Sequence, residues 1–110
     1  MRTLLRLIVT VVVVLAATHA PLQATDAAAG KELFLKKCKT CHGEDGNGTP
    51  AMQKTFGDKL QPLGSAAVQS LDDAALAKAF RAGATHKGVE KSVTDADLGN
   101  LIAFIRTLKH

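Results

Sequence analysis

Apolar residues recur at helical spacing near the C-terminus, and this is the strongest pattern in the sequence. The apolar positions are Leu98, Leu101, Ile102, Ile105 and Leu108, and Phe104 widens the stripe. Such three- and four-residue spacing predicts an amphipathic helix. Thr94, followed three residues later by Asp97, forms an S/T-x-x-D/E start signal. We therefore predict a helix from about Thr94 to Lys109.

A second helix is predicted to begin at Thr25 or Asp26. Thr25 and Asp26 are both common N-cap residue types, and helix-forming residues continue to about Lys37. Gly30 lies inside this helix, where glycine costs about 1 kcal/mol relative to alanine. Phe34 lies one turn later on the same face. We expect another helix to cross at Gly30, with Phe34 packed beside the crossing.

A third helix is expected in the second half of the chain. Ser70 is the predicted N-cap, with Asp73 at the third helical position, and Gly83 is expected to end the helix in the C′ manner. The apolar stripe consists of Leu76, Ala79 and Phe80. Residues 51–56 form a predicted short turn of helix between two glycine- and proline-containing breaks.

The N-terminus differs from the rest of the chain because it is continuously apolar. Leu7 to Ala17 carries no charge and follows Arg2 and Arg6, an arrangement typical of a secretory signal peptide. The run is shorter than the about 20 apolar residues that span a membrane. We predict that residues 1–24 are a signal peptide, and that residues 25–110 form one domain with no stable membrane insertion after cleavage. An uncleaved membrane anchor is the alternative.

Composition narrows the classes of partner. The net charge is +4, and loss of Arg2 and Arg6 with the signal peptide leaves +2, since the first acidic residue is Asp26. No basic run with interleaved aromatic residues is present, so nucleic acid is not an expected partner. The chain has only two cysteines, so a disulfide framework is also excluded.

Those two cysteines lie in Cys38-Lys39-Thr40-Cys41-His42, the C-x-x-C-H attachment motif of a c-type haem. Two thiols on one helical turn can each add to a vinyl group of one porphyrin, and His42 can then bind the iron as the proximal ligand. A zinc site would need further ligands, and a thioredoxin-like site would need a neighbouring strand. We predict one covalent haem, with a backbone carbonyl of the following loop, Pro50 being the first choice, accepting a hydrogen bond from the second ring nitrogen of His42.

Four features follow one another in the order found in a known family. They are Gly30-x-x-x-Phe34, Cys38-x-x-Cys41-His42-Gly43, a glycine-rich loop ending in Pro50, and Leu101-x-x-Phe104-Ile105. In these features the chain resembles the small class I cytochromes c, from about Asp26 to Lys109. The resemblance implies an all-α cytochrome c fold of roughly three to five helices around one covalently attached haem. It also implies that the first and last helices cross near Gly30, against Phe104, and that the protein transfers electrons in the periplasm.

The sequence departs from this family at the sixth iron ligand. The family usually supplies a methionine from the loop before the last helix, about seven residues before an apolar residue. Here the apolar residue is Val93, the position seven residues earlier is His86, and no methionine follows Met52. We expect His86 to be the sixth ligand. Met52 is a less favoured alternative, and a vacant site or ligation by Lys87 also stays open.

The sixth ligand determines the expected chemistry. A second imidazole favours ferric iron, whereas a methionine thioether raises the potential. We therefore expect a low-potential, bis-His, monohaem electron-transfer protein that cycles Fe(II)/Fe(III). With both axial positions filled, no enzymatic activity is expected.

Lysines beside the motif and beside His86 would steer acidic, transient redox partner proteins. The alternatives are a haem subunit or sensor with a labile sixth ligand, the electron-entry module of a larger redox enzyme complex, or a thiol oxidoreductase without haem.

Overall fold

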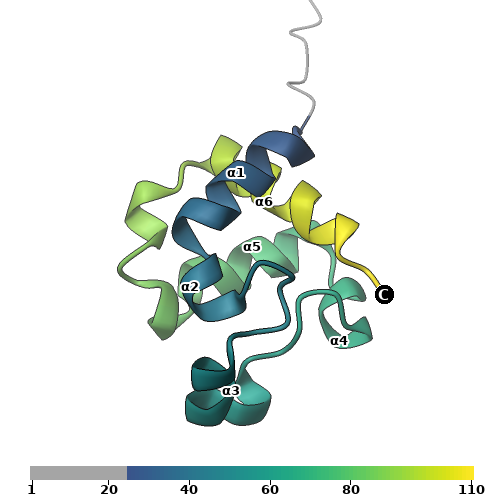
Figure 1. Ribbon diagram of the computed structural model, residues 1–110. Helices are drawn as coiled ribbons and strands as arrows, with labels where there is room; N and C mark the ends of the chain where they lie inside the picture. The colour runs from purple at the N-terminus through teal and green to yellow at the C-terminus, as the bar shows by residue number, and fades with distance from the viewer. Residues whose placement is uncertain (1–24) are drawn as a thin grey trace, which may run out of the picture.

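The structure is a computed structural model that describes residues 25–110, and the predicted signal peptide, residues 1–24, lies outside the described residues. The α-helices are α1 (Ala27–Lys37), α2 (Lys39–His42), α3 (Pro50–Phe56), α4 (Ala66–Gln69), α5 (Asp73–Ala82) and α6 (Asp95–Thr107) (Figure 1). The 3-10 turns are η1 (Gly57–Lys59), η2 (Ala84–His86) and η3 (Glu90–Ser92). Residues 25–110 contain no strand, which confirms the all-α prediction. The resemblance implied three to five helices, and the four longer helices, α1, α3, α5 and α6, agree with that number. The helices α2 and α4 are single turns.

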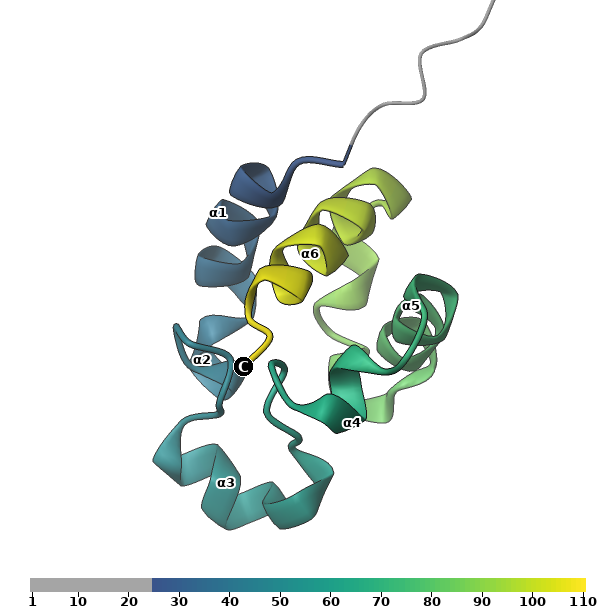
Figure 2. The ribbon, with the colours of Figure 1, turned by 90° about the vertical axis from the view of Figure 1, so that its right-hand side faces the viewer.

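The helices α1 and α6 cross, and this crossing forms the centre of the hydrophobic core (Figure 2). A Cβ atom at Gly30 would overlap the backbone carbonyl of Asn100, so the crossing requires glycine at this position. Beside it, the Phe34 and Phe104 rings pack with centroids 5.1 Å apart. The buried cluster consists of Phe34, Val93, Leu98, Leu101, Ile102 and Phe104. The predicted crossing at Gly30, with Phe34 against Phe104, is confirmed.

The ends of α1 and α6 are fixed by the caps that their sequences predict. The Asp26 carboxylate accepts hydrogen bonds from the backbone N–H groups of Ala28 and Ala29, at 2.9 and 3.1 Å. Thr94 and Asp97 form the reciprocal capping box, with both bonds 3.1 Å long. These bonds satisfy amide groups that have no partner within the helix. Both predicted helix starts are confirmed.

The start of α5 differs from the prediction. Asp72, not Ser70, is the N-cap, and its carboxylate accepts from the Ala75 N–H at 2.7 Å. Ser70 instead ends α4, a turn that the sequence did not predict, and its hydroxyl donates to the Ala67 carbonyl. Asp73 is therefore the first helical residue of α5 and not the third.

The end of α5 and its inner face also differ from the prediction. Gly83 has φ −67°, so it is not in the left-handed conformation expected for a C′ glycine. Glycine is favoured here for another reason, because a Cβ at this position would lie 2.8 Å from the Ala79 carbonyl oxygen. Leu76, Ala77 and Phe80 face the core, whereas the side chain of Ala79 is exposed.

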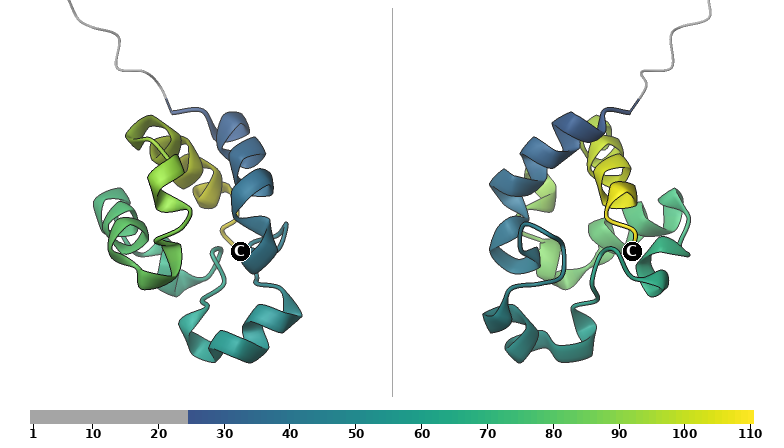
Figure 3. Two further views of the ribbon diagram at one scale, coloured as in Figure 1. Left: turned by 90° about the vertical axis from the view of Figure 1, so that its left-hand side faces the viewer. Right: turned by 45° about the vertical axis from the view of Figure 1, so that its right-hand side comes forward.

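The lower part of the molecule is built from loops and short helices (Figures 2 and 3). The helix α3 begins with Pro50, is capped by the Thr49 hydroxyl, and packs mainly against η1. The chain around Gly64 joins this region to the C-terminus, because the Gly64 carbonyl accepts from the backbone N–H of His110 at 3.3 Å. None of the helices within residues 25–110 has the length and apolarity to cross a membrane.

Candidate functional site

The C-x-x-C-H motif forms a single turn directly after α1. Cys38 is the residue between α1 and α2, and the backbone N–H groups of Cys41 and His42 both bond to its carbonyl, at 3.3 and 3.0 Å. The cysteine side chains therefore come from the same turn. Neither cysteine forms a disulfide, and Cys38 is half-buried whereas Cys41 is exposed. Burial, with a further contribution from Cys41, raises the pKa of the Cys38 thiol.

The glycine-rich loop after His42 folds back onto the motif. The Gly48 N–H donates to the His42 carbonyl at 2.6 Å, and the Thr49 N–H donates to the Cys41 carbonyl at 3.0 Å. Gly43 and Gly48 have φ angles of 72° and 89°, which side chains with a Cβ adopt only under strain. The loop therefore fixes the turn that carries His42.

His86 is held from the opposite direction by α5 and η2. Its backbone N–H donates to the Gly83 carbonyl at 3.1 Å, which closes the 3-10 turn. Its ring packs against the Phe80 ring, with centroids 4.9 Å apart and planes tilted by 38°. The lack of a Cβ at Gly83 leaves room for the ring, because that atom would lie 3.1 Å from the His86 Nδ1.

The structure brings the His42 and His86 rings close together, in nearly parallel planes. Their centroids are 6.2 Å apart and their planes differ by 16°. A metal–imidazole bond is about 2 Å long, and a nitrogen of a five-membered ring with bonds of about 1.33 Å lies about 1.1 Å from the ring centre. Two imidazoles whose Nε2 atoms point at one metal ion from opposite sides therefore have centroids roughly 6.2 Å apart. The observed spacing fits ligation of one iron by both rings.

The ring nitrogens support the same arrangement. In both rings Nδ1 is buried without a hydrogen-bond partner in the described structure, which leaves Nε2 as the accessible nitrogen. Burial lowers the pKa of both imidazoles, and the nearby His86 lowers that of His42 further. Both rings are thereby favoured in the neutral form, which is the form that binds a metal.

The bond predicted from the ring of His42 to the Pro50 carbonyl is not made. The His42 Nδ1 has no partner among residues 25–110. Pro50 is the first residue of α3, where a carbonyl is committed to the N–H four residues later in the helix. This detail of the prediction was therefore wrong.

The two alternative sixth ligands lie on α3 and directly after η2. Met52 is half-buried on α3, where its backbone N–H bonds to the capping hydroxyl of Thr49. Lys87 directly follows η2, and its side chain is exposed. Neither is part of the aromatic contacts that join the two histidines, which run from Phe34 through His42 and His86 to Phe80.

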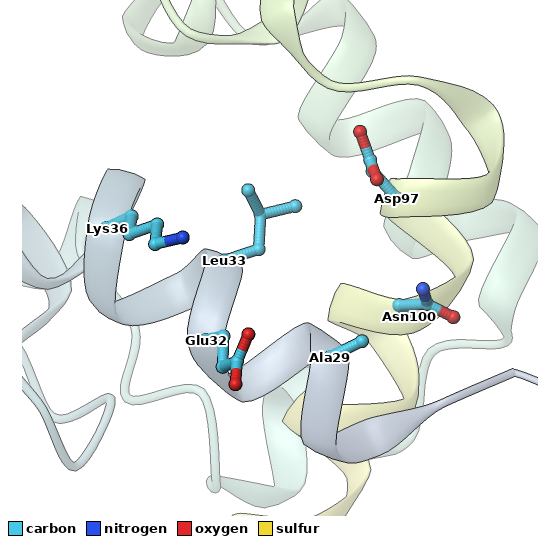
Figure 4. A pocket seen from close by; sticks show the side chains of 6 residues that line it. All are labelled: Ala29, Glu32, Leu33, Lys36, Asp97 and Asn100. Atoms are coloured by element: carbon cyan, nitrogen blue, oxygen red, sulfur yellow. The ribbon is translucent and has the colours of Figure 1, made fainter.

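A separate pocket of about 200 Å³ lies between α1 and α6. It is lined by Ala29, Glu32, Leu33, Lys36, Asp97 and Asn100, as Figure 4 shows. None of these is a cysteine or histidine, so the pocket is not part of the haem site. Within residues 25–110 there is also no group of three or more side chains suited to hold a bare metal ion.

Two residues of α5 could not be assigned a role from the sequence. Phe80 was expected only as a core residue, and the contact with His86 depends on the direction of the chain after Gly83. Arg81 was not singled out, because its partners are nine and fourteen residues later and no local pattern marks them.

Comparison with known proteins agrees with the motif and the fold. The family model described as Cytochrome c matches residues 27–109, nearly all of the described chain. No curated protein and no solved structure matches the chain.

Proposed function

Because the chain belongs to the cytochrome c family, whose members bind covalently attached haem c and transfer electrons, we propose that it is a periplasmic bis-His electron carrier. The haem and electron transfer follow from the family. The axial ligands, the low potential and the compartment are the proposal. The observation that carries it is the 6.2 Å spacing of the nearly parallel His42 and His86 rings.

In this proposal each residue of the motif has one role. Cys38 and Cys41 would hold the porphyrin through thioether bonds to its two vinyl groups. His42 and His86 would bind the iron through their Nε2 atoms. The group supplies an iron that alternates between Fe(II) and Fe(III).

The rest of the chain limits the access of water to this site. Phe34 is 1% exposed and lies beside His42, with ring centroids 6.3 Å apart. Phe80 covers His86 on the other side. Apolar rings around the ligands would act equally on a His–Met variant of the same chain, so the comparison depends on the ligand, and histidine in place of methionine favours the ferric state. We therefore expect a lower potential than in a His–Met variant of the same chain.

Two protein ligands on the iron leave no open position for a substrate. Catalysis on peroxide, nitrite or oxygen requires such a position, so the proposed function is electron transfer without enzymatic activity.

Exposed lysines offer a surface for an acidic redox partner. Lys36 and Lys37 end α1, and Lys91 lies in η3. The Lys37 ammonium donates to the Ser92 hydroxyl at 2.8 Å, which brings the two segments together. Attraction by such a cluster raises the association rate and weakens as salt increases. Electron-transfer rates with an acidic partner should therefore fall as ionic strength rises.

The N-terminal pattern in residues 1–24 supports the proposed periplasmic location, since covalent haem attachment and a signal peptide both fit an exported protein. Cell fractionation followed by mass spectrometry of the mature N-terminus tests this part. A haem protein that begins at Thr25 in the periplasmic fraction is the expected result, and one that retains Met1 in the membrane fraction would contradict it.

Optical spectra of the ferric protein test the proposed ligands. His86→Ala should keep the haem attached on a denaturing gel but convert the iron from low spin to high spin. Met52→Leu is the matched control and should leave the spectrum unchanged. A low-spin spectrum in His86→Ala, or the weak long-wavelength band of methionine-ligated haem in the wild type, would refute ligation by His86.

A further inference from the structure

The segment that carries His86 has few backbone ties to the rest of the molecule. We define the ligand loop as residues 84–92, from the start of η2 to the end of η3. Its backbone bonds are local: the Val89 N–H donates to the His86 carbonyl and the Ser92 N–H to the Val89 carbonyl, at 3.1 and 3.0 Å. Apart from the bond of the His86 N–H to the carbonyl of Gly83, the C-cap of α5, such short-range bonds stabilise the turns but do not hold them against α5. Side chains must supply that contact.

Arg81, in the last turn of α5, makes the most extensive of these side-chain contacts. One guanidinium nitrogen donates to the Glu90 backbone carbonyl at 2.8 Å and lies 3.3 Å from the Glu90 carboxylate. The other terminal nitrogen donates to the Asp95 carboxylate at 3.0 Å. A planar fork serves acceptors at both of its terminal nitrogens in a fixed geometry, whereas an ammonium group is a compact point charge. Arg81 therefore ties α5 to the end of the ligand loop and to the start of α6.

The bond to the Glu90 carbonyl is the central one. The Arg81 and Glu90 side chains are 30% and 26% exposed, so their interaction is partly shielded from solvent. The Asp95 carboxylate is fully exposed, so that ion pair contributes little. The Glu90 carbonyl also accepts from the N–H of Val93, which is buried in the core. Arg81 thus fixes the point where the loop enters the core.

The same side chain reaches the wall behind His86. The Arg81 guanidinium carbon lies 5.7 Å from the centre of the Phe80 ring, within the range of a cation–π contact. Phe80 in turn packs on His86. One residue therefore contacts both the far end of the loop and the ring that supports the histidine.

From these contacts we propose that Arg81 is a positioning residue, which holds the ligand loop against α5 and keeps His86 opposite His42. The proposal deepens the proposed function and rests on it, because His86 must be the sixth ligand for the consequence at the iron. Loss of Arg81 would let the loop leave α5 more often, and His86 would leave the iron with it.

A second side-chain contact still holds one end of the ligand loop when Arg81 is replaced. The Lys37 ammonium, at the end of α1, donates to the Ser92 hydroxyl. This bond is exposed and does not involve α5, so it should limit the movement of Ser92 but not that of the turn containing His86. The Arg81 variant should therefore fold and retain haem.

The test measures carbon monoxide binding to the ferrous holoprotein in wild type, Arg81→Gln, Arg81→Lys and Arg106→Gln. When a protein ligand must leave first, the binding rate saturates at the rate of loop opening. Arg81→Gln removes a charge-assisted hydrogen bond and an ion pair, so the saturating rate should rise about tenfold. Arg81→Lys keeps the charge but not the planar fork, so its saturating rate should lie between those of the wild type and Arg81→Gln.

Arg106→Gln is the matched control. Arg106 is also 30% exposed, pairs with Asp73 at 2.8 Å, and donates to the carbonyls of Gln69 and Leu71, which are outside the ligand loop. Its loss should lower the free energy of unfolding but change the carbon monoxide rate by less than about twofold. An equal acceleration in both arginine variants would refute a specific role for Arg81.

Amide hydrogen exchange of the same holoproteins gives a readout that does not depend on the iron ligand. Exchange in residues 84–92 should accelerate in Arg81→Gln and not in Arg106→Gln. Unchanged exchange there in Arg81→Gln would overturn the proposal.

The failure of the proposed function has a different signature. A wild-type carbon monoxide rate that stays proportional to concentration, and that His86→Ala does not increase, would refute ligation by His86. Hydrogen exchange would then decide the role of Arg81 by itself.

Discussion

The crossing of α1 and α6 allows a quantitative prediction for Gly30→Ala. The added Cβ would overlap the Asn100 carbonyl and lie 3.1 Å from the Leu101 backbone nitrogen. Both neighbours belong to the backbone of α6, so a change of rotamer cannot relieve the overlap. The two helices must therefore move apart.

The cost follows from the packing on either side of the crossing. A gap of about 0.5–1 Å forfeits a quarter to a half of each dispersion contact across it. Phe34, Leu101 and Phe104 are 1%, 3% and 6% exposed, so all three lose contacts. Overpacking of this kind costs about 3 kcal/mol, and the better helix propensity of alanine offsets about 1 kcal/mol. We expect a net loss of about 2 kcal/mol in the free energy of unfolding.

Urea unfolding of the holoprotein, followed by circular dichroism, measures this loss. Gly99→Ala is the matched control, because Gly99 lies in α6 next to Asn100 but a Cβ there would meet only the Thr25 methyl group, at 3.5 Å. That variant should be unchanged or more stable by up to about 1 kcal/mol. If Gly30→Ala proved as stable as Gly99→Ala, the reasoning about the crossing would be refuted.

Three further substitutions test local features. The Asn47 backbone N–H lies 2.9 Å from the Asp45 carboxylate and lowers the Asp45 pKa. The stability that the charged carboxylate adds is complete above the ordinary carboxyl pKa of about 4. It is lost as pH falls through the lower pKa of the folded state. The difference in urea midpoint between wild type and Asp45→Asn should therefore be constant from about pH 5 to 8 and fade below about pH 4; a difference that persists in acid would contradict this. Gly83→Ala places a Cβ 3.1 Å from the His86 Nδ1, so the ferric spectrum should gain a high-spin fraction, and a purely low-spin spectrum would count against the contact. Thr94→Ala breaks the capping box of α6 and should cost about 1 kcal/mol in urea unfolding, whereas a loss near zero would indicate that the cap adds nothing.

The features that the sequence predicted correctly are mostly local. Asp26 and Thr94 cap their helices through groups two or three residues away, so the relevant partners are visible in the sequence itself. The C-x-x-C-H turn is likewise a single-turn feature. The crossing at Gly30 involves distant residues, but a glycine inside a helix is costly enough to mark such a contact in advance.

The features that could not be predicted depend on competition or on distant partners. Ser70 and Asp72 are both good N-cap residues, and the choice of Asp72 depends on α4, which ends at Gln69 and takes Ser70 as its C-cap. Gly83 leads directly into η2, a turn that the sequence did not predict. The contacts of Arg81 depend on how the chain folds between α5 and α6.

Low-temperature electron paramagnetic resonance of the ferric wild-type protein is the most direct measurement of the pairing of His42 with His86. The two ring planes differ by 16°, and nearly parallel imidazoles lower the symmetry at the iron in its equatorial plane. The account predicts one low-spin, rhombic signal of a bis-imidazole haem, which disappears in His86→Ala. A high-spin axial signal from the wild type, or a low-spin signal that survives the loss of His86, would contradict it.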